Sequence, residues 1–158
     1  AYLGDLLPML APTLNSYKRL VEGYWAPTRP TWGIDNRTVA LRVIPGGPKS
    51  TRLETRLPGS DVNPYLSVAA CLAAGLRGIA EGLELDTDPV SGSGYDSTAP
   101  RYPTTLEEAT RRFSDSAVAR ELLGDEFVDH FATSRRWEWN ESLKAVTDWE
   151  LRRYFEIV

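Results

Sequence analysis

The hydrophobic pattern of the chain alternates between helical and strand-like stretches. At the start, leucines recur at helical spacing, although Pro8 and Pro12 limit how far a helix extends (Leu3, Leu6, Leu7 and Leu10). Residues 65–85 form a second apolar stretch with few charges, preceded by Asn63 as a cap and by Pro64 at a first helical position. The second stretch predicts a helix that is buried.

Two short runs between these stretches have the composition of β-strands. Residues 37–44 are mostly β-branched and aliphatic, and residues 51–57 follow a turn-forming Pro-Gly-Gly-Pro sequence. We predict that the two runs pair as a hairpin. In the second run, the period of two places Arg52, Glu54 and Arg56 on one face, and leucines and a threonine on the other.

The remaining segments divide into loops and helices. Residues 15–35 combine glycine and proline with aromatic residues, and residues 86–103 lack periodicity, so we predict loops, the second of them exposed. Helices are predicted over 105–113 and 116–123 and again from Asp125 to the end. In the last segment, the side chains expected to face inward are Phe127, Phe131, Trp139, Leu143, Val146 and Trp149.

Length and composition restrict the chain to one domain or a piece of one. It has 158 residues, of which 42% are hydrophobic and 25% charged, and no apolar run approaches the roughly 20 residues of a membrane span. The lone Cys71 cannot form an internal disulfide, and together with the single His130 it cannot build a zinc site. We interpret Cys71 as an inert core residue and expect a cytoplasmic protein without a histidine-dependent hydrolase site.

Basic residues are concentrated in one part of an acidic chain. The net charge of −4 argues against a broad nucleic-acid-binding surface, yet residues 15–56 carry eight basic and only three acidic residues. A cationic region of this kind indicates a small anionic ligand. The alternative is a solvated sheet face with salt bridges, and charge alone is compatible with both.

Two short motifs are set aside. The sequence Gly-Gly-Pro-Lys-Ser at 46–50 lacks the glycine that a Walker phosphate loop has before its lysine. Asn36-Arg37-Thr38 matches a glycosylation acceptor, which we treat as a chance match in an unexported protein. Neither motif predicts a site.

An ordered set of motifs gives a stronger signal. In chain order they are NSYKRL (15–20), GY (23–24), AP (26–27), DNR (35–37), LR (41–42), RLETR (52–56) and PGSDVNPY (58–65). In this order and near this spacing they strongly resemble the C-terminal catalytic half of the glutamine synthetase family, densely over residues 1–85 and more weakly beyond. The resemblance implies an α+β fold in which antiparallel strands form one wall of the active site and helices pack outside.

The resemblance also implies an ATP-dependent carboxylate–amine ligase. Family members use ATP, with Mg²⁺ or Mn²⁺, to phosphorylate the γ-carboxylate of glutamate, and ammonia or an organic amine then displaces the phosphate. Arginine forks and divalent cations stabilise phosphoryl transfer, which would account for the cationic region. The alternative is a non-catalytic scaffold or regulatory paralogue, against which the retained charged residues argue.

Matching motif positions assign roles to six charged residues. The implied roles are binding of glutamate (Arg19 and Arg56), contact near the transferring phosphate (Arg37), binding of the ATP phosphates (Arg42 and Arg52) and ligation of one of two metal ions (Glu54). For Arg42 and Lys49 the salt-bridged alternative stays open, because the turn between the strands is one residue shorter than in typical bacterial members.

The chain departs from the family pattern at Trp25. Glutamine synthetases have a glutamate there, directly after Gly-Tyr, which takes a proton from ammonium, and a tryptophan cannot act as a base. Members that use organic amines commonly depart from the pattern at this loop, and an indole can cover an apolar substituent or face an ammonium. We therefore count Trp25 among the catalytic-site residues and favour an organic amine over ammonia. Two alternatives stay open: Trp25 only packs the loop, or Glu22 replaces the missing base.

The family's chain is longer than this one. We interpret residues 1–158 as the C-terminal part of the catalytic domain, because the N-terminal β-grasp domain and the first part of the catalytic domain have no counterpart in them. The isolated chain is therefore expected to be inactive. The full-length protein is expected to form homo-oligomers of stacked six-membered rings, with neither nucleic acid nor membrane as a partner.

Overall fold

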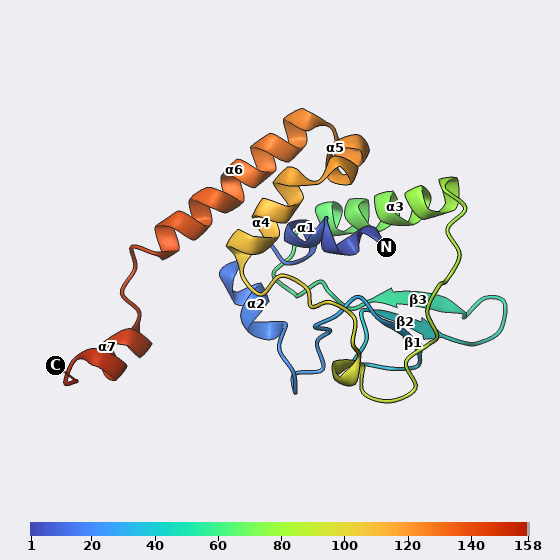
Figure 1. The fold of residues 1–158 in the computed structure, drawn as a ribbon, viewed down its shortest axis with the longest axis horizontal. Helices are drawn as coiled ribbons and strands as arrows, with labels where there is room; N and C mark the ends of the chain where they lie inside the picture. Colours follow the sequence, from blue (N-terminus) through green and yellow to red (C-terminus); the bar gives the residue numbers. More distant parts are fainter. Residues whose placement is uncertain (158) are drawn as a thin grey trace.

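Helices and a small sheet form two layers in the computed structural model, which describes residues 1–157 (Figure 1). The helical elements are η1 (Tyr2–Gly4), α1 (Leu7–Leu10), α2 (Leu14–Arg19), α3 (Pro64–Ala80), η2 (Gly94–Asp96), α4 (Leu106–Asp115), α5 (Ala117–Leu123), α6 (Asp125–Ser142) and α7 (Asp148–Tyr154), and the strands are β1 (Trp32–Ile34), β2 (Leu41–Ile44) and β3 (Arg52–Thr55). The α+β class is confirmed. Among residues 1–157, no helix has the length and apolar composition needed to cross a membrane.

The sheet confirms the predicted hairpin and adds one strand to it. Strands β2 and β3 pair antiparallel, with Arg42 opposite Glu54, and both are shorter than predicted. Strand β1 pairs parallel to β2, so the sheet is mixed where only antiparallel strands were expected. Segment 15–35 was therefore wrongly predicted to be loop throughout, because it contains both α2 and β1. Three strand residues are too few for a visible alternation.

The core lies where the helices meet. The leucines at the start of the chain are buried as their spacing predicts, and α1 packs between α3 and α4. Phe113 of α4 is fully buried and meets the ring of Phe131 of α6 edge to face, with 5.7 Å between the ring centroids. This arrangement of the rings is a favourable one for aromatic side chains.

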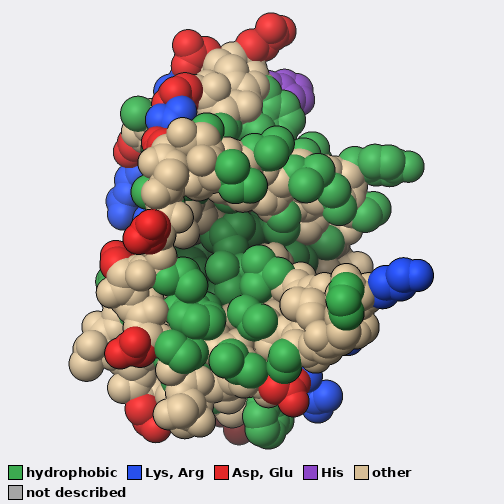
Figure 2. Space-filling model, turned by 90° about the vertical axis from the view of Figure 1, so that its right-hand side faces the viewer, with side chains coloured by type: hydrophobic (Ala, Val, Ile, Leu, Met, Phe, Trp, Pro, Cys, Tyr) green, Lys and Arg blue, Asp and Glu red, His purple; other side chains and the backbone are tan. Residues whose placement is uncertain are grey.

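Helix α3 begins as predicted but is not buried as predicted. The Asn63 side chain accepts hydrogen bonds from the backbone amides of Tyr65 and Leu66, which caps the helix. Cys71 is half-buried against the core, whereas four apolar side chains are more than half exposed (Val68, Leu72, Leu76 and Ile79). The elements described within residues 1–157 cover one face of the helix and leave the other open. Apolar side chains also gather in a hollow on the face shown in Figure 2.

The C-terminal third agrees with the prediction only up to α6. Thr105 and Ser116 cap α4 and α5 as expected, and Phe131, Phe127 and Trp139 of α6 pack on the core. The other three side chains that were expected to face inward are exposed (Leu143, Val146 and Trp149). The reason is that α6 ends at Ser142, after which the chain leaves the core and α7 stands apart from it (Figure 1).

Leucine truncation tests the position of the core. Leu106→Ala removes a fully buried side chain at the start of α4 and should lower the free energy of unfolding by about 2–5 kcal/mol. Leu143→Ala is the matched control, because this side chain is mostly exposed, and it should cost less than about 0.5 kcal/mol. Urea unfolding followed by circular dichroism measures both. Equal losses would contradict the described core.

Candidate active site

An acidic side chain on the sheet lies between two arginines. Arg42 of β2 and Arg56, just after β3, both donate from Nη1 to Oε2 of Glu54 over 3.2 Å. Arg56 Nη1 also lies 3.3 Å from Oε1 of the same carboxylate. The antiparallel register produces the cluster, because it places Arg42 directly across from Glu54.

The two arginines determine the ionisation of Glu54. Partial burial would raise the pKa of its carboxyl, but the hydrogen bonds and positive charges of Arg42 and Arg56 outweigh burial and hold the pKa below its usual value. The carboxyl is therefore ionised at neutral pH. A salt-bridged sheet face, one of the two interpretations of the basic residues, is present at Arg42 and Glu54.

Arg42 also holds Asp35, the residue that directly follows β1. Its Nε donates to Asp35 over 3.1 Å, and its Nη2 forms an ion pair with the same carboxylate. The hydrogen bond from Arg42 is the main reason that the pKa of Asp35 lies below its usual value. Asp35 has a positive φ of 49°, a conformation that aspartate tolerates better than most residues.

Arg56 connects the sheet to two loops. Its Nη2 donates to the backbone oxygen of Trp25 over 2.9 Å, and its Nε donates to the backbone oxygen of Arg37 over 3.0 Å. Trp25 has a positive φ of 56°, which is unusual for a bulky residue and needs support from its surroundings. The Arg56 guanidinium supplies that support, because it holds the strained residue by its carbonyl.

These loops surround a cleft of about 740 Å³. Its walls are formed by Gly23, Trp25, Ile34, Asp35, Asn36, Arg37, Thr38, Arg42, Ser91, Gly92, Ser93 and Tyr95. The side chain of Trp25 is 64% exposed, so packing within the described chain does not bury it. The cleft therefore brings together an accessible indole and the guanidinium groups of Arg37 and Arg42.

Arg19 lies in a smaller cleft of about 380 Å³, shared with Asp61 and Ser16 among others. Its guanidinium donates to the backbone oxygen of Leu57. Burial lowers the pKa of Arg19, the charge of Asp61 opposes that shift, and the positive charge of nearby Arg56 adds to it. Arg19 and Arg56, the two arginines assigned to glutamate, are therefore near enough for their charges to interact.

Three other residues singled out from the sequence lie away from the larger cleft. Arg52 is exposed and turns back to the backbone oxygen of Ser50 over 3.2 Å, so it does not join the Glu54 cluster. Lys49 is exposed in the turn between β2 and β3. Glu22, considered as a replacement base, forms an ion pair with Arg101 and is not among the residues that line the cleft.

Residues 91–95 belong to a loop that is mostly exposed, as predicted, but sequence reasoning missed that they form one wall of the cleft. Asn36 holds that wall in place by donating from Nδ2 to the backbone oxygens of Val90 and Gly92. The available signal was the Asn-Arg-Thr sequence set aside as a chance glycosylation match. It forms a local turn in which Asn36 accepts from the backbone and hydroxyl of Thr38.

Comparison with known proteins identifies the family. The sequence model described as glutamine synthetase, catalytic domain, matches residues 1–154. The chain belongs to the glutamine synthetase family. Structural similarity agrees, since the structure described as GmaS/ADP complex, conformation 1, superposes with a TM-score of 0.81 at 35% identity, over 97% of this chain and 36% of the other.

The curated relatives within the glutamine synthetase family are named for different products or substrates. Type-1 glutamine synthetase 2 of Dictyostelium discoideum is 56% identical over 99% of this chain and 30% of its own length. Gamma-glutamylethanolamide synthetase GlnA4 of Streptomyces coelicolor is 51% identical over 94% of this chain and 32% of its own length. Glutamate–isopropylamine ligase of a Pseudomonas species is 42% identical over 98% of this chain and 34% of its own length. The chain thus spans about a third of the length of these relatives.

The described residues do not by themselves make the metal centre that the glutamine synthetase resemblance implies. Within residues 1–157, no three histidine, cysteine, aspartate or glutamate side chains gather as metal ligands. Glu54 offers a single carboxylate, and both of its oxygens face arginines. Its assignment as a ligand therefore requires further ligands from outside these residues.

The lowered pKa of Glu54 leads to a prediction about stability and pH. The ionised carboxylate stabilises the fold fully above its usual pKa of 4.5, and that contribution is lost as the pH falls through the lower pKa of the folded state. Glu54→Gln should therefore be less stable than wild type at about pH 7, and the difference should shrink toward about pH 3. Urea unfolding at both pH values measures it.

Glu84→Gln serves as the control in this experiment, because Glu84 is an exposed acid in the loop after α3. This variant should match wild type at both pH values. If Glu54→Gln lost the same stability at low and neutral pH, the arginines would not lower the pKa of Glu54 in the folded state.

Proposed function

We propose that the full-length protein is an ATP-dependent ligase that joins the γ-carboxylate of glutamate to an amine. The observation that carries the proposal is the larger cleft, where the guanidinium groups of Arg37 and Arg42 and the exposed indole of Trp25 face one space. Family membership supports ATP and glutamate as substrates, and two relatives are named for organic amines.

The proposed reaction has two steps. A γ-carboxylate oxygen of glutamate attacks the terminal phosphorus of ATP and ADP leaves, and the amine nitrogen then attacks the acyl carbon and releases phosphate. We assign Arg37 to the transferring phosphate, since its side chain is exposed at the cleft, and Arg42 to the ATP phosphates. Arg19 and Arg56 remain our candidates for glutamate, and Arg52, outside the cluster, is the weakest candidate for ATP.

We further propose an organic amine as the acceptor. Position 25 holds an indole that presents apolar surface to the cleft, and Glu22, the nearest candidate for a replacement base, is engaged by Arg101. An acceptor with a carbon substituent gains from apolar contact with the indole, a contact that ammonia cannot make. Either acceptor must lose a proton before its nitrogen attacks, so the apolar contact is what favours the organic amine.

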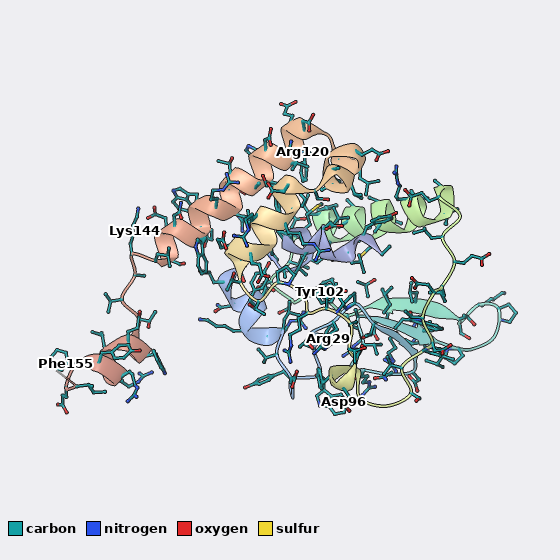
Figure 3. The ribbon with its side chains drawn as sticks, in the orientation of Figure 1. Arg29, Asp96, Tyr102, Arg120, Lys144 and Phe155 are labelled. Atoms are coloured by element: carbon teal, nitrogen blue, oxygen red, sulfur yellow. The ribbon has the colours of Figure 1, made fainter. Side chains whose placement is uncertain are left out.

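The assembly of the full-length protein is also part of the proposal. Helix α7 stands away from the core, and it exposes the large apolar side chain of Trp149. Phe155, which directly follows the helix and is labelled in Figure 3, is exposed as well. Apolar surface of this kind usually lies in an interface, and we propose that it packs against another subunit of a homo-oligomeric ring assembly.

An assay of phosphate release tests the function. The full-length protein should release phosphate from ATP when glutamate and an amine are both present, and its product should be a γ-glutamyl amide detectable by mass spectrometry. Residues 1–158 alone should show no turnover. If the full-length protein released no phosphate with ammonia or any amine, while binding its partner subunits normally, it would instead be a non-catalytic scaffold.

Substitution of Trp25 tests the acceptor. Trp25→Glu introduces a base for ammonium and removes apolar surface worth about 2 kcal/mol to a bulky amine. The ratio of kcat/KM for ammonia to kcat/KM for the organic amine should rise by about tenfold or more. Steady-state kinetics with both acceptors measures this ratio.

The control for this substitution is Glu22→Pro, which removes the only other carboxylate considered as a base. It should leave the acceptor ratio unchanged. If wild type already preferred ammonia, with Glu22→Pro abolishing turnover and Trp25→Glu changing little, the tryptophan would only pack the loop.

A further inference from the structure

A segment far along the chain fastens the backbone just beyond the tryptophan loop, which we define as residues 21–25. The backbone amide of Tyr102 donates to the backbone oxygen of Thr28 over 2.9 Å. The guanidinium of Arg29 donates to the backbone oxygen of Ala99 (Figure 3). Tyr102 is itself buried in the core. Two contacts therefore tie the chain after the tryptophan loop to a segment with a buried anchor.

Arg101 reaches from this segment, residues 99–102, to the beginning of the tryptophan loop. Its guanidinium forms an ion pair with Glu22, and in the described part of the chain neither side chain has another charged partner. Pro100 directly precedes Arg101, and Pro103 follows it two positions later. Because proline fixes its own φ and restricts the residue before it, the backbone on both sides of Arg101 is stiff. The ion pair thus joins the loop to a rigid support.

The tryptophan loop depends on such contacts from outside. All of its residues are exposed, and Gly23 and Trp25 have positive φ values of 87° and 56°. Side chains from other elements hold it at two places. Arg101 pairs with Glu22, and Nη2 of Arg56 donates to the backbone oxygen of Trp25 over 2.9 Å. Gly23 and Trp25 line the larger cleft, so these two contacts determine where that part of the wall lies.

We infer that the ion pair between Arg101 and Glu22 positions the tryptophan loop during the reaction, so that the activated carboxylate meets the amine and not water. The inference rests on the proposed function, in which an acyl phosphate waits in the cleft for the amine. If the loop moves away, a water oxygen attacks the acyl carbon and the bond from that carbon to the phosphate oxygen breaks. Phosphate and free glutamate leave, and a proton passes to solvent. ATP is then consumed without formation of the amide.

The exposure of the pair indicates a weak, reversible contact. The side chains of Arg101 and Glu22 are 50% and 47% exposed, and the loss of an exposed ion pair shifts an equilibrium by up to about fivefold. The loop can therefore still open to admit substrates and release products. Glu22 is not among the residues that line the cleft, so it acts through the loop and is a positioning residue.

Charge reversal in the full-length protein tests the inference. Arg101→Glu and Glu22→Arg each replace attraction by repulsion, and the phosphate released in excess of amide, per amide formed, should rise about two- to fivefold. The double variant restores the pair in the opposite order and should return to the wild-type value. The ratio of kcat/KM for ammonia to kcat/KM for the organic amine should stay within about twofold, because both acceptors meet the same loop. Phosphate assay and mass spectrometry of the amide measure these quantities.

Arg111→Glu is the matched control. It breaks an exposed ion pair with Glu107 on α4, 3.6 Å long and outside the cleft lining, and should leave the excess phosphate unchanged. Because the excess is counted per amide, a variant that is merely less stable would not change it. If a reversal prevents folding, Arg101→Gln removes the charge more gently and should give the same direction of change.

Three outcomes would overturn the inference. The first is folded single variants that keep the wild-type excess of phosphate. The second is a double variant that stays uncoupled, because the two residues would then act separately. The third is a selective loss of ammonia turnover in Glu22→Arg that the double variant does not restore, which would make Glu22 the base.

The position of the loop can also be measured without turnover. Tyr24 and Trp25 are exposed, and chymotrypsin should cut after them about two- to fivefold faster in Arg101→Glu than in wild type or the double variant. Equal cleavage rates would overturn the positioning role. Wild type without turnover on any acceptor would overturn the proposed function and the role of the pair in it. Turnover with unchanged excess phosphate in the variants would overturn the role of the pair alone.

Discussion

The carboxylate of Glu54 holds the candidate site together. Without it, the guanidinium groups of Arg42 and Arg56, both largely buried, would repel each other across two adjacent strands. The carboxylate takes up only the Nη1 donor of each arginine, so the other N–H groups of both guanidiniums can bind other elements. Arg42 uses them on Asp35, and Arg56 uses them on the carbonyls of Trp25 and Arg37.

This arrangement places strain where the ligand would bind. Trp25 and Asp35 are the two non-glycine residues with positive φ among those described, and each is held by an arginine of the Glu54 cluster. The sheet thereby holds the loops that carry these two residues. A preorganised cleft spends little free energy on ordering its own walls when a ligand binds.

Local features of the sequence predicted local features of the structure. Asn63, Thr105 and Ser116 cap helices as their positions indicate, and the hairpin follows from its turn residues. The alternation in β3 correctly placed Glu54 beside Arg56, but it could not show that Arg52 turns back toward its own loop. At an exposed strand end, the direction of a long side chain depends on the groups near it and not only on the alternation of residues between the two faces.

Features that depend on distant segments were not visible in the sequence. The apolar sequence of α3 predicts that the helix packs against other elements, but it does not show which element covers each face. Similarly, the loop at 91–95 looks exposed by composition, and hydrogen bonds from residues more than fifty positions away, Asn36 and Thr38 among them, make it a wall.

The motif DNR drew attention to Arg37 for its charge, whereas its asparagine organises the opposite, neutral side of the cleft. One short turn thus serves both walls. Arg56 holds the backbone oxygen of Arg37, and Arg37 itself lines the cleft. The side-chain amide of Asn36 positions the loop on the opposite wall.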